Sequence, residues 1–303
     1  MDLRCAAWAR TEGVDPIGTA GCYAGFLGVD WRRPWPRDVS EVEALAPLVA
    51  ATTERGFRLQ GLLPVDGAKT ARVVLYQAGP GPGFDTYRRL EVECAPDEVV
   101  DAAAGLLGRP AAEATVAPPG GDVLVCTHGR RDICCGSRGT ALLGEVDDAG
   151  VLPAGTRLWA TTHTGGHRFA PNAIVLPEGT VWGFLDAGRL GRIVRREGPV
   201  DDLLPHYRGC AGLGSPAQQA LERAVLGEVG WDLFACRRTG TELGEGRVRL
   251  EVTDPDSAVR AWEAVVEVGR VLPVPDCGQP VTAAVKTEPE LVLTGLRRDD
   301  ERF

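Results

Sequence analysis

Long apolar runs and an excess of positive charge are both missing from this sequence of 303 residues. No apolar segment approaches the roughly 20 residues that a membrane-spanning helix needs, so we expect no membrane association. The formal net charge of −9 argues against a nucleic-acid or anionic-membrane surface. The stretch that begins with Met1–Cys5 lacks the apolar region of a secretory signal. We therefore expect a cytoplasmic protein.

Motifs of the common enzyme classes are also missing. The segment Gly79–Gly83 alternates glycine and proline, but it lacks the Lys-Ser/Thr pair of a phosphate-binding P-loop. No flavin or nicotinamide motif is visible, and the carboxylates are scattered without a recognisable acid/base pair. No two cysteines are spaced as in the Cys-x-x-Cys motif of thiol oxidoreductases. These absences favour a binding or carrier role over substrate turnover.

Histidine is scarce, and its distribution is uneven. The chain has four histidines, and three of them fall between positions 128 and 167. The nine cysteines are an odd number scattered over a long chain, unlike the dense framework of a small disulfide-rich domain. In a reducing compartment, most such cysteines are buried thiols and a minority are ligands or nucleophiles. We expect the first group to comprise Cys5, Cys22, Cys94, Cys210, Cys236 and Cys277.

Two predicted loops carry the remaining cysteines and the clustered histidines. The apolar run 123–126 predicts a buried strand that ends at Cys126, and Cys135 follows at the expected start of a helix. A second strand over 157–161 leads into a loop with His163 and His167. Two thiolates and two imidazoles on adjacent loops make a metal site the first hypothesis.

The spacing of these side chains bears on the kind of metal. Eight residues separate Cys126 from Cys135, whereas structural zinc sites usually have two to four residues between paired cysteines. The long loop suits a larger inorganic group, such as a [2Fe–2S] cluster with cysteines on one iron and histidines on the other, as in Rieske centres. It is not the Rieske pattern itself, which places one cysteine and one histidine in each loop.

The two motifs resemble those of the sucrase/ferredoxin-like family. Residues 126–136 read C-T-H-G-x-R-D-x-x-C-G, and residues 163–172 read H-x-G-G-H-x-F-A-x-N. The resemblance implies a thioredoxin-like ferredoxin whose [2Fe–2S] cluster is ligated by Cys126, Cys135, His163 and His167. No glycosidase chemistry in the chain supports a sucrase activity.

The sequence departs from the family pattern at two positions. Thr127 stands where the family often has glycine, and Cys134 is an extra thiol beside Cys135. The following Gly136 aligns Cys135 as the second cysteine ligand.

Several other residues of the two loops are expected to support the ligands. We expect His128 to hold its loop rather than ligate, and Asp132 to cap the following helix or to pair with Arg131. Loop glycines are expected to let backbone N–H groups approach the sulfurs. These four are Gly129, Gly136, Gly165 and Gly166. Arginines near the cluster would raise its potential, and the candidates are Arg130, Arg131, Arg138 and Arg168.

The pattern of the whole chain predicts an α/β protein with several units. Residues 1–108 form an N-terminal α/β unit, 109–121 a linker, 122–214 a thioredoxin-like ferredoxin domain and 215–303 a small β-rich α+β appendage. Strand and helix alternate in the third segment before a strand pair and a closing helix, as in a thioredoxin-like domain. No internal repeat is strong enough to establish whether the two α/β units share a fold.

The leading functional hypothesis is a one-electron carrier. Its reductant and its acceptor would be other proteins, and its potential would lie above the roughly −400 mV of plant-type ferredoxins. One alternative is a thioredoxin-like thiol oxidoreductase with Cys126 or Cys135 as nucleophile. Another is a structural zinc module that uses the same two cysteines and two histidines.

Overall fold

The computed structural model describes residues 4–116 and 121–299. Residues 1–3 of the predicted N-terminal unit, 117–120 of the predicted linker and 300–303 of the predicted appendage lie outside the described residues. Within the described chain, no helix combines the length and the apolar character needed to cross a membrane. A mixed sheet with helices and a separate antiparallel sheet confirm the predicted α/β class.

The first α/β unit is a four-stranded sheet with two main helices. Its elements are β1 (Gly25–Asp30), α2 (Ala46–Glu54), β2 (Phe57–Leu62), β3 (Ala71–Ala78), β4 (Tyr87–Cys94) and α3 (Val99–Leu107). Strands β1 and β2 run parallel, β3 is antiparallel to β1, and β4 is antiparallel to β3. The strand order is therefore β2-β1-β3-β4.

The second unit repeats this arrangement. Its elements are β6 (Asp122–Cys126), α4 (Ile133–Ala149), β7 (Arg157–Thr161), β8 (Ala173–Leu176), β9 (Thr180–Trp182) and α5 (Ala187–Arg195). Strands β6 and β7 run parallel, β8 is antiparallel to β6, and β9 is antiparallel to β8. The order β7-β6-β8-β9 matches that of the first unit. The two units thus share one topology, a question that the sequence left open.

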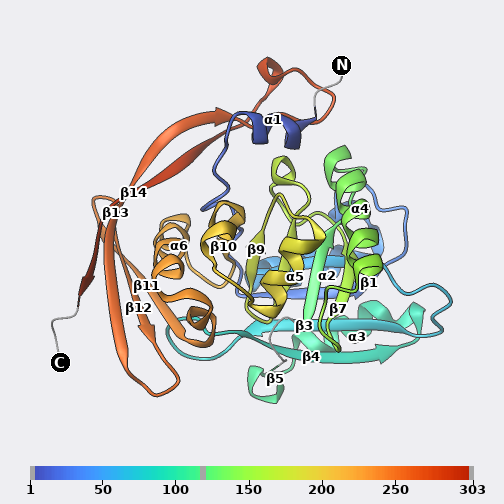
Figure 1. Ribbon diagram of the computed structural model, residues 1–303. Coiled ribbons are helices and arrows are strands. Elements are labelled where there is room, and N and C mark those ends of the chain that lie inside the picture. The colour runs from blue at the N-terminus through green and yellow to red at the C-terminus, as the bar shows by residue number, and fades with distance from the viewer. Residues whose placement is uncertain (1–3, 117–120, 300–303) are drawn as a thin grey trace.

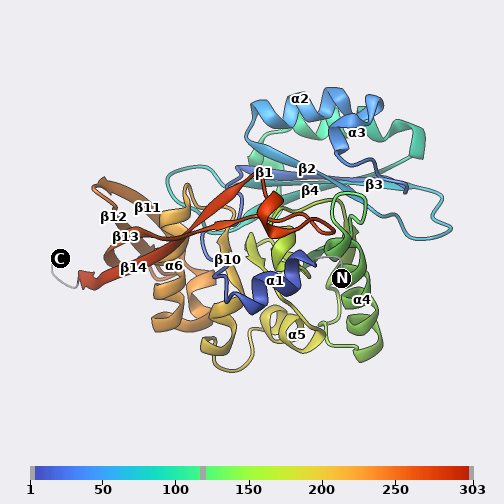
Figure 2. The ribbon, with the colours of Figure 1, turned by 90° about the horizontal axis from the view of Figure 1, so that it is seen from above.

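A single ten-stranded sheet contains both units. Strands β2 and β7 pair antiparallel at Leu62 and Thr161, and β10 (Tyr207–Cys210) extends the far edge beside β9. Strand β5 (Thr115–Val116) lies in the predicted linker and pairs with β4. Helices α2 and α3 cover one side of the sheet, and α4 and α5 lie on the other (Figure 2). The loops that follow β6 and β7 therefore start near the middle of the sheet.

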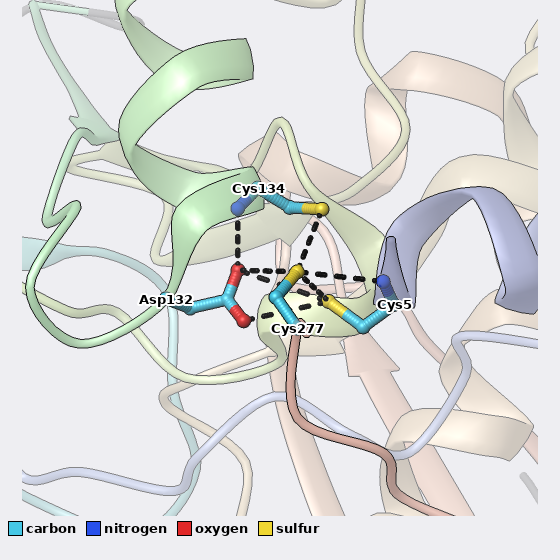
Figure 3. Close-up of side chains that lie close together, drawn as sticks. All are labelled: Cys5, Asp132, Cys134 and Cys277. Carbon is cyan, nitrogen blue, oxygen red and sulfur yellow. Dashed lines mark hydrogen bonds between the residues drawn. The ribbon is translucent and has the colours of Figure 1, made fainter. Parts of the chain in front are cut away.

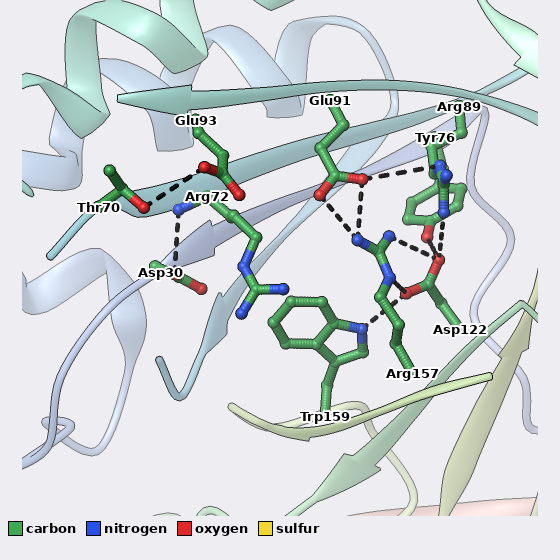
Figure 4. A network of polar contacts seen from close by, with 10 residues as sticks. All are labelled: Asp30, Thr70, Arg72, Tyr76, Arg89, Glu91, Glu93, Asp122, Arg157 and Trp159. Carbon is green, nitrogen blue, oxygen red and sulfur yellow. Dashed lines mark hydrogen bonds and ion pairs between the residues drawn. The ribbon is translucent and has the colours of Figure 1, made fainter. Parts of the chain in front are cut away.

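A buried ionic network joins the two units (Figure 4). The carboxylate of Asp122 accepts hydrogen bonds from Arg157 Nε at 2.7 Å and from Trp159 Nε1 at 2.7 Å. The hydroxyl of Tyr76 on β3 and the guanidinium of Arg89 on β4 donate to the same carboxylate. Arg157 also donates to Glu91 at 2.7 Å. Since Asp122 begins β6, the network connects the second unit directly to β3 and β4.

The C-terminal part forms the predicted β-rich appendage. Strands β11 (Arg237–Gly244), β12 (Arg247–Thr253), β13 (Val259–Pro273) and β14 (Thr287–Asp299) make a separate antiparallel sheet. Alternate residues of β12 are fully buried, as its sequence pattern predicts. Helix α6 (Pro216–Val229) packs against β10 on one side and against β12 and β13 on the other (Figure 1).

The longest hairpin reaches across the molecule. Strands β13 and β14 extend from the four-stranded sheet to the N-terminal helix α1 (Cys5–Thr11), as Figures 1 and 2 show. The backbone N–H of Val274 donates to the carbonyl of Lys286 at 2.8 Å and closes the base of the hairpin tip, residues 274–286. Helix α1 in turn packs on the short 3₁₀ helix η5 (His167–Phe169). Helix α1, close to the N-terminus, and the hairpin tip therefore meet near the loop that carries His163 and His167.

Candidate metal centre

The end of a buried strand and a helix cap place the two cysteines of the first loop. Strand β6 is buried along its length and ends at Cys126. The Oδ1 atom of Asp132 accepts the backbone N–H groups of Cys134 at 2.8 Å and of Cys135 at 3.1 Å, so Asp132 is the N-cap of α4. The predicted capping role of Asp132 is confirmed, and Arg131 instead approaches Asp38 at 3.9 Å. The cap fixes Cys135 in the first turn of α4.

Glycines bring α4 close to the end of β6. A Cβ atom on Gly139 would lie 1.9 Å from the carbonyl oxygen of Cys126. A Cβ atom on Gly136 would lie 2.4 Å from the Cα atom of Gly129 in the loop. The structure thus gives Gly129 and Gly136 a packing role, because their backbones touch. Without side chains at these positions, Cys135 can lie directly against Cys126.

The second loop delivers His163 with a free ring nitrogen. The backbone N–H of His163 donates to Nδ1 of His128 at 3.3 Å, and its carbonyl accepts a hydrogen bond from Arg58. Among the residues that the structure describes, none forms a hydrogen bond with the buried Nδ1 atom of His163. A buried polar atom without a partner costs about 1–3 kcal/mol, and a bound ligand at this nitrogen would remove that cost.

Three of the four predicted ligands come together. The Sγ atoms of Cys126 and Cys135 and a ring nitrogen of His163 all lie within 4.8 Å of one another. Both cysteines are 0% exposed. The hydrogen bond between the two thiols lowers the pKa of Cys126 well below its usual value and raises that of Cys135 well above it. Such a set of soft sulfur and imidazole donors is suited to zinc or iron.

His167, the fourth predicted ligand, lies beside this group rather than in it. Its ring centroid is 6.2 Å from that of His163. Its Nε2 atom lies 3.3 Å from the carbonyl oxygen of Pro275 and 4.0 Å from the carboxylate of Asp276. The hairpin tip of residues 274–286 therefore covers the outer side of His167.

His128 supports the two loops. Its Nε2 atom lies 2.7 Å from the carbonyl oxygen of Pro36, and its Nδ1 atom accepts from the backbone of His163. Its ring also packs edge-on against Trp35. Burial lowers the pKa of His128, so the ring is neutral with its proton on Nε2. Both nitrogens are thus engaged by backbone, as expected of a residue that does not ligate.

Two side chains that the sequence analysis did not single out hold the second loop. Arg208 donates to the carbonyl of Gly165 at 3.1 Å and to Oδ1 of Asn172 at 3.3 Å. The side-chain amide of Asn172 donates to the carbonyl of Gly166 at 2.9 Å. Gly165 and Gly166 have φ angles of +87° and +64°, and a Cβ atom on Gly166 would lie 2.3 Å from Arg208. Asn172 belongs to the second motif, whereas no local pattern marks Arg208.

Arg208 also places a buried positive charge near the cysteines. Its side chain is 1% exposed, and burial lowers its pKa to about 10, so it stays charged at neutral pH. Its electrostatic interaction with Cys135 partly offsets this lowering of the pKa of Arg208. Of the arginines expected near the site, Arg168 is buried and pairs with Glu288 at 2.9 Å.

A second group of donor atoms includes Cys134, the residue that precedes Cys135 in the chain (Figure 3). The side chains of Cys5, Asp132, Cys134 and Cys277 place one ligand atom each within 4.8 Å of one another. Figure 3 shows them converging from α1, the start of α4 and the hairpin tip. Cys5 and Cys277 are among the expected structural thiols; the structure buries Cys5 and leaves Cys277 partly exposed, and no sequence spacing relates either of them to Cys134.

Comparison with known proteins agrees with the motifs. The model of the family described as sucrase/ferredoxin-like matches residues 17–209, which include both loops and most of both α/β units. No curated protein and no solved structure matches the chain. The match covers more than half of the 303 residues, and the chain therefore belongs to the sucrase/ferredoxin-like family.

Proposed function

We propose that this protein is a one-electron carrier whose [2Fe–2S] cluster is held by Cys126, Cys135, His163 and His167. The observation that carries the proposal is the convergence of two buried sulfurs with a ring nitrogen of His163, whose Nδ1 atom is buried without a hydrogen-bond partner. Two bridged irons with a cysteine pair on one and a histidine pair on the other use such a donor set.

The surroundings of His167 support its inclusion. Histidines that bind metals usually donate their other ring N–H to a carbonyl or carboxylate. Nε2 of His167 already lies 3.3 Å from the carbonyl of Pro275, which leaves Nδ1 as its ligand atom. His163 likewise offers Nδ1. Both histidines would therefore bind through the same atom.

The charges of the site favour a potential above that of all-cysteine ferredoxins. A bound cluster supplies a one-electron couple, and two thiolates leave it with less negative charge than four do. The buried guanidinium of Arg208 near Cys135 further stabilises an added electron. We expect a potential above about −400 mV, towards the Rieske range.

The histidine side of the site is its accessible side. His163 lines a cleft of about 580 Å³ together with His128, Arg58 and Arg131, whereas both cysteines are fully buried. We propose that redox partner proteins, a reductase and an acceptor, dock at this cleft and exchange electrons through His163. All nine cysteines are free, as suits a reducing compartment, and we place the protein in the cytoplasm.

Burial weighs against a thiol oxidoreductase. A nucleophilic cysteine must be reached by its substrate, and reactive cysteines are at least partly exposed. Cys126 and Cys135 are both 0% exposed. The geometry thus suits metal ligation better than thiol exchange.

Anaerobic purification tests the proposal. We expect a red-brown protein with two irons and two sulfides per chain and a rhombic EPR signal after dithionite. Cys126→Ser and His163→Ala should each lose the colour and the iron, while Cys94→Ser, remote from both donor groups, should keep them. A colourless protein whose zinc is lost in Cys126→Ser and His163→Ala would overturn the proposal in favour of a zinc module.

A further inference from the structure

Three thiols and one carboxylate meet in a second group that the proposed cluster does not use. The Sγ atom of Cys277 lies 3.1 Å from that of Cys134 and 3.3 Å from that of Cys5. The carboxylate of Asp132 approaches Cys5 Sγ at 3.5 Å and Cys277 Sγ at 3.7 Å. These residues are up to 272 positions apart in the chain.

Burial sets this group apart from ordinary surface cysteines. Cys5 is 0% exposed, Cys134 is 1% exposed and Asp132 is 5% exposed. The three cysteines are free thiols, so no disulfide accounts for their convergence. Two buried sulfurs and the partly buried sulfur of Cys277 around one carboxylate are a donor set for a soft divalent ion.

We propose that Cys5, Cys134, Cys277 and Asp132 form a structural site for one Zn²⁺ ion. Zinc prefers four tetrahedral ligands, and its bonds to sulfur are about 2.3 Å long, which places two ligand sulfurs about 3.8 Å apart. The sulfurs need to separate by only about 0.5–0.7 Å from their present positions to reach that spacing. A spread of at most 4.8 Å among the four donors suits one ion.

The two oxygens of the Asp132 carboxylate have different neighbours. Oδ1 accepts the N–H groups of Cys134 and Cys135 as the helix cap, and it also lies 3.7 Å from the Sγ atom of Cys277. Oδ2 faces the Sγ atom of Cys5 at 3.5 Å and is the oxygen available to the ion. Cys134 also lies in the first turn of α4, where the helix dipole favours a thiolate.

The ion would fasten the N-terminal helix α1 and the hairpin tip to the start of α4. Cys5 belongs to α1, and Cys277 belongs to the hairpin tip whose Pro275 faces His167. Zinc would therefore hold Pro275 against the outer nitrogen of His167. This consequence rests on the proposed function, whereas the zinc site itself does not.

Metal analysis of single variants tests the site. The wild-type chain, treated with a chelator and titrated with Zn²⁺, should bind one equivalent with high affinity. Cys134→Ser and Cys277→Ser should each lower zinc affinity at least tenfold and keep iron and colour, and Cys94→Ser should bind zinc like the wild type. With Co²⁺ in place of Zn²⁺, the thiolate-to-cobalt absorption should weaken in Cys134→Ser and Cys277→Ser.

The outcomes separate this proposal from the cluster. Cys126→Ser should lose iron and retain zinc, so a failure of the cluster leaves the zinc result readable. Zinc affinity and cobalt absorption that are unchanged in both Cys134→Ser and Cys277→Ser would overturn the site. So would a disulfide between two of the three cysteines, located by peptide mass mapping of protein purified under reducing conditions.

Discussion

Cys134 and Cys135 are neighbours in the chain, yet their sulfurs belong to different groups. Cys134 Sγ lies 3.1 Å from Cys277 Sγ, while Cys135 Sγ lies within 4.8 Å of the donors of Cys126 and His163. Successive residues of an α-helix point about 100° apart, so one helix start can serve two sites. Asp132 fixes this division, because it caps both backbone N–H groups.

Replacing Cys135 by serine should therefore affect the bound iron differently from replacing Cys134 by serine. We expect Cys135→Ser to lose most of its iron and its visible absorption, because it removes one of two sulfur ligands. Cys134→Ser should keep both. Iron analysis and absorption spectra of the two variants, purified side by side, check the expectation, and equal iron loss in both would contradict it.

Two glycines of α4, Gly139 and Gly144, allow a controlled test of how the helix packs against the first loop. Gly139→Ala places a Cβ atom 1.9 Å from the carbonyl oxygen of Cys126, so the helix must move. We expect the unfolding free energy to fall by about 1–3 kcal/mol and the bound iron to be lost. At Gly144 no atom lies within 4 Å of an added Cβ, and Gly144→Ala should stabilise the helix by about 0.5–1 kcal/mol. Denaturation and iron content measure both effects, and iron retention in Gly139→Ala would refute the packing argument.

The buried guanidinium of Arg208 has separable roles in geometry and charge. Arg208→Met removes the donors to Gly165 and Asn172 and should cost about 1–3 kcal/mol for the acceptors left buried. Because Arg208→Met also removes a positive charge near Cys135, it should lower the reduction potential of the cluster. Arg208→Lys should keep a potential close to the wild type while still losing stability. Potentiometric titration checks this, and equal potentials in Met and Lys variants would rule out the charge effect.

The parts of the site that follow from local pattern could be predicted from the sequence. A buried strand that ends at Cys126 and a capped helix that starts after Asp132 were both expected, because apolar runs and caps act over a few residues. The convergence of Cys126, Cys135 and His163 agrees with the motifs, although metal ligation at these residues stays a prediction.

Contacts between distant segments could not be predicted in this way. Cys5 and Cys277 meet only because the long β13–β14 hairpin crosses the molecule. Arg208 reaches the second loop from β10, at the edge of the ten-stranded sheet. Such contacts depend on the packing of whole elements, which no local spacing records.

The network around Asp122 is expected to hold the two α/β units together. Asp122→Asn keeps the shape of the side chain but removes the charge that Arg157 and Arg89 approach. Since the carboxylate is 1% exposed, we expect a loss of about 3 kcal/mol in unfolding free energy. Glu93→Gln is the control. The Glu93 carboxylate lies near the surface and accepts a long hydrogen bond from Thr70 at 3.4 Å. Urea unfolding compares the two, and similar midpoints would count against the network.

Removing zinc should loosen the hairpin tip and, through it, His167. Cys277 anchors residues 274–286 at the proposed ion, so chelation should raise hydrogen exchange there, while β12, an inner strand of the four-stranded sheet, stays protected. Because Pro275 then moves from Nε2 of His167, the reduction potential should shift in the same sample. Cys277→Ser should show both changes without chelator. Faster exchange with an unchanged potential would support the zinc site but show that the tip does not act on His167. Unchanged exchange would contradict the anchoring of the tip by the ion.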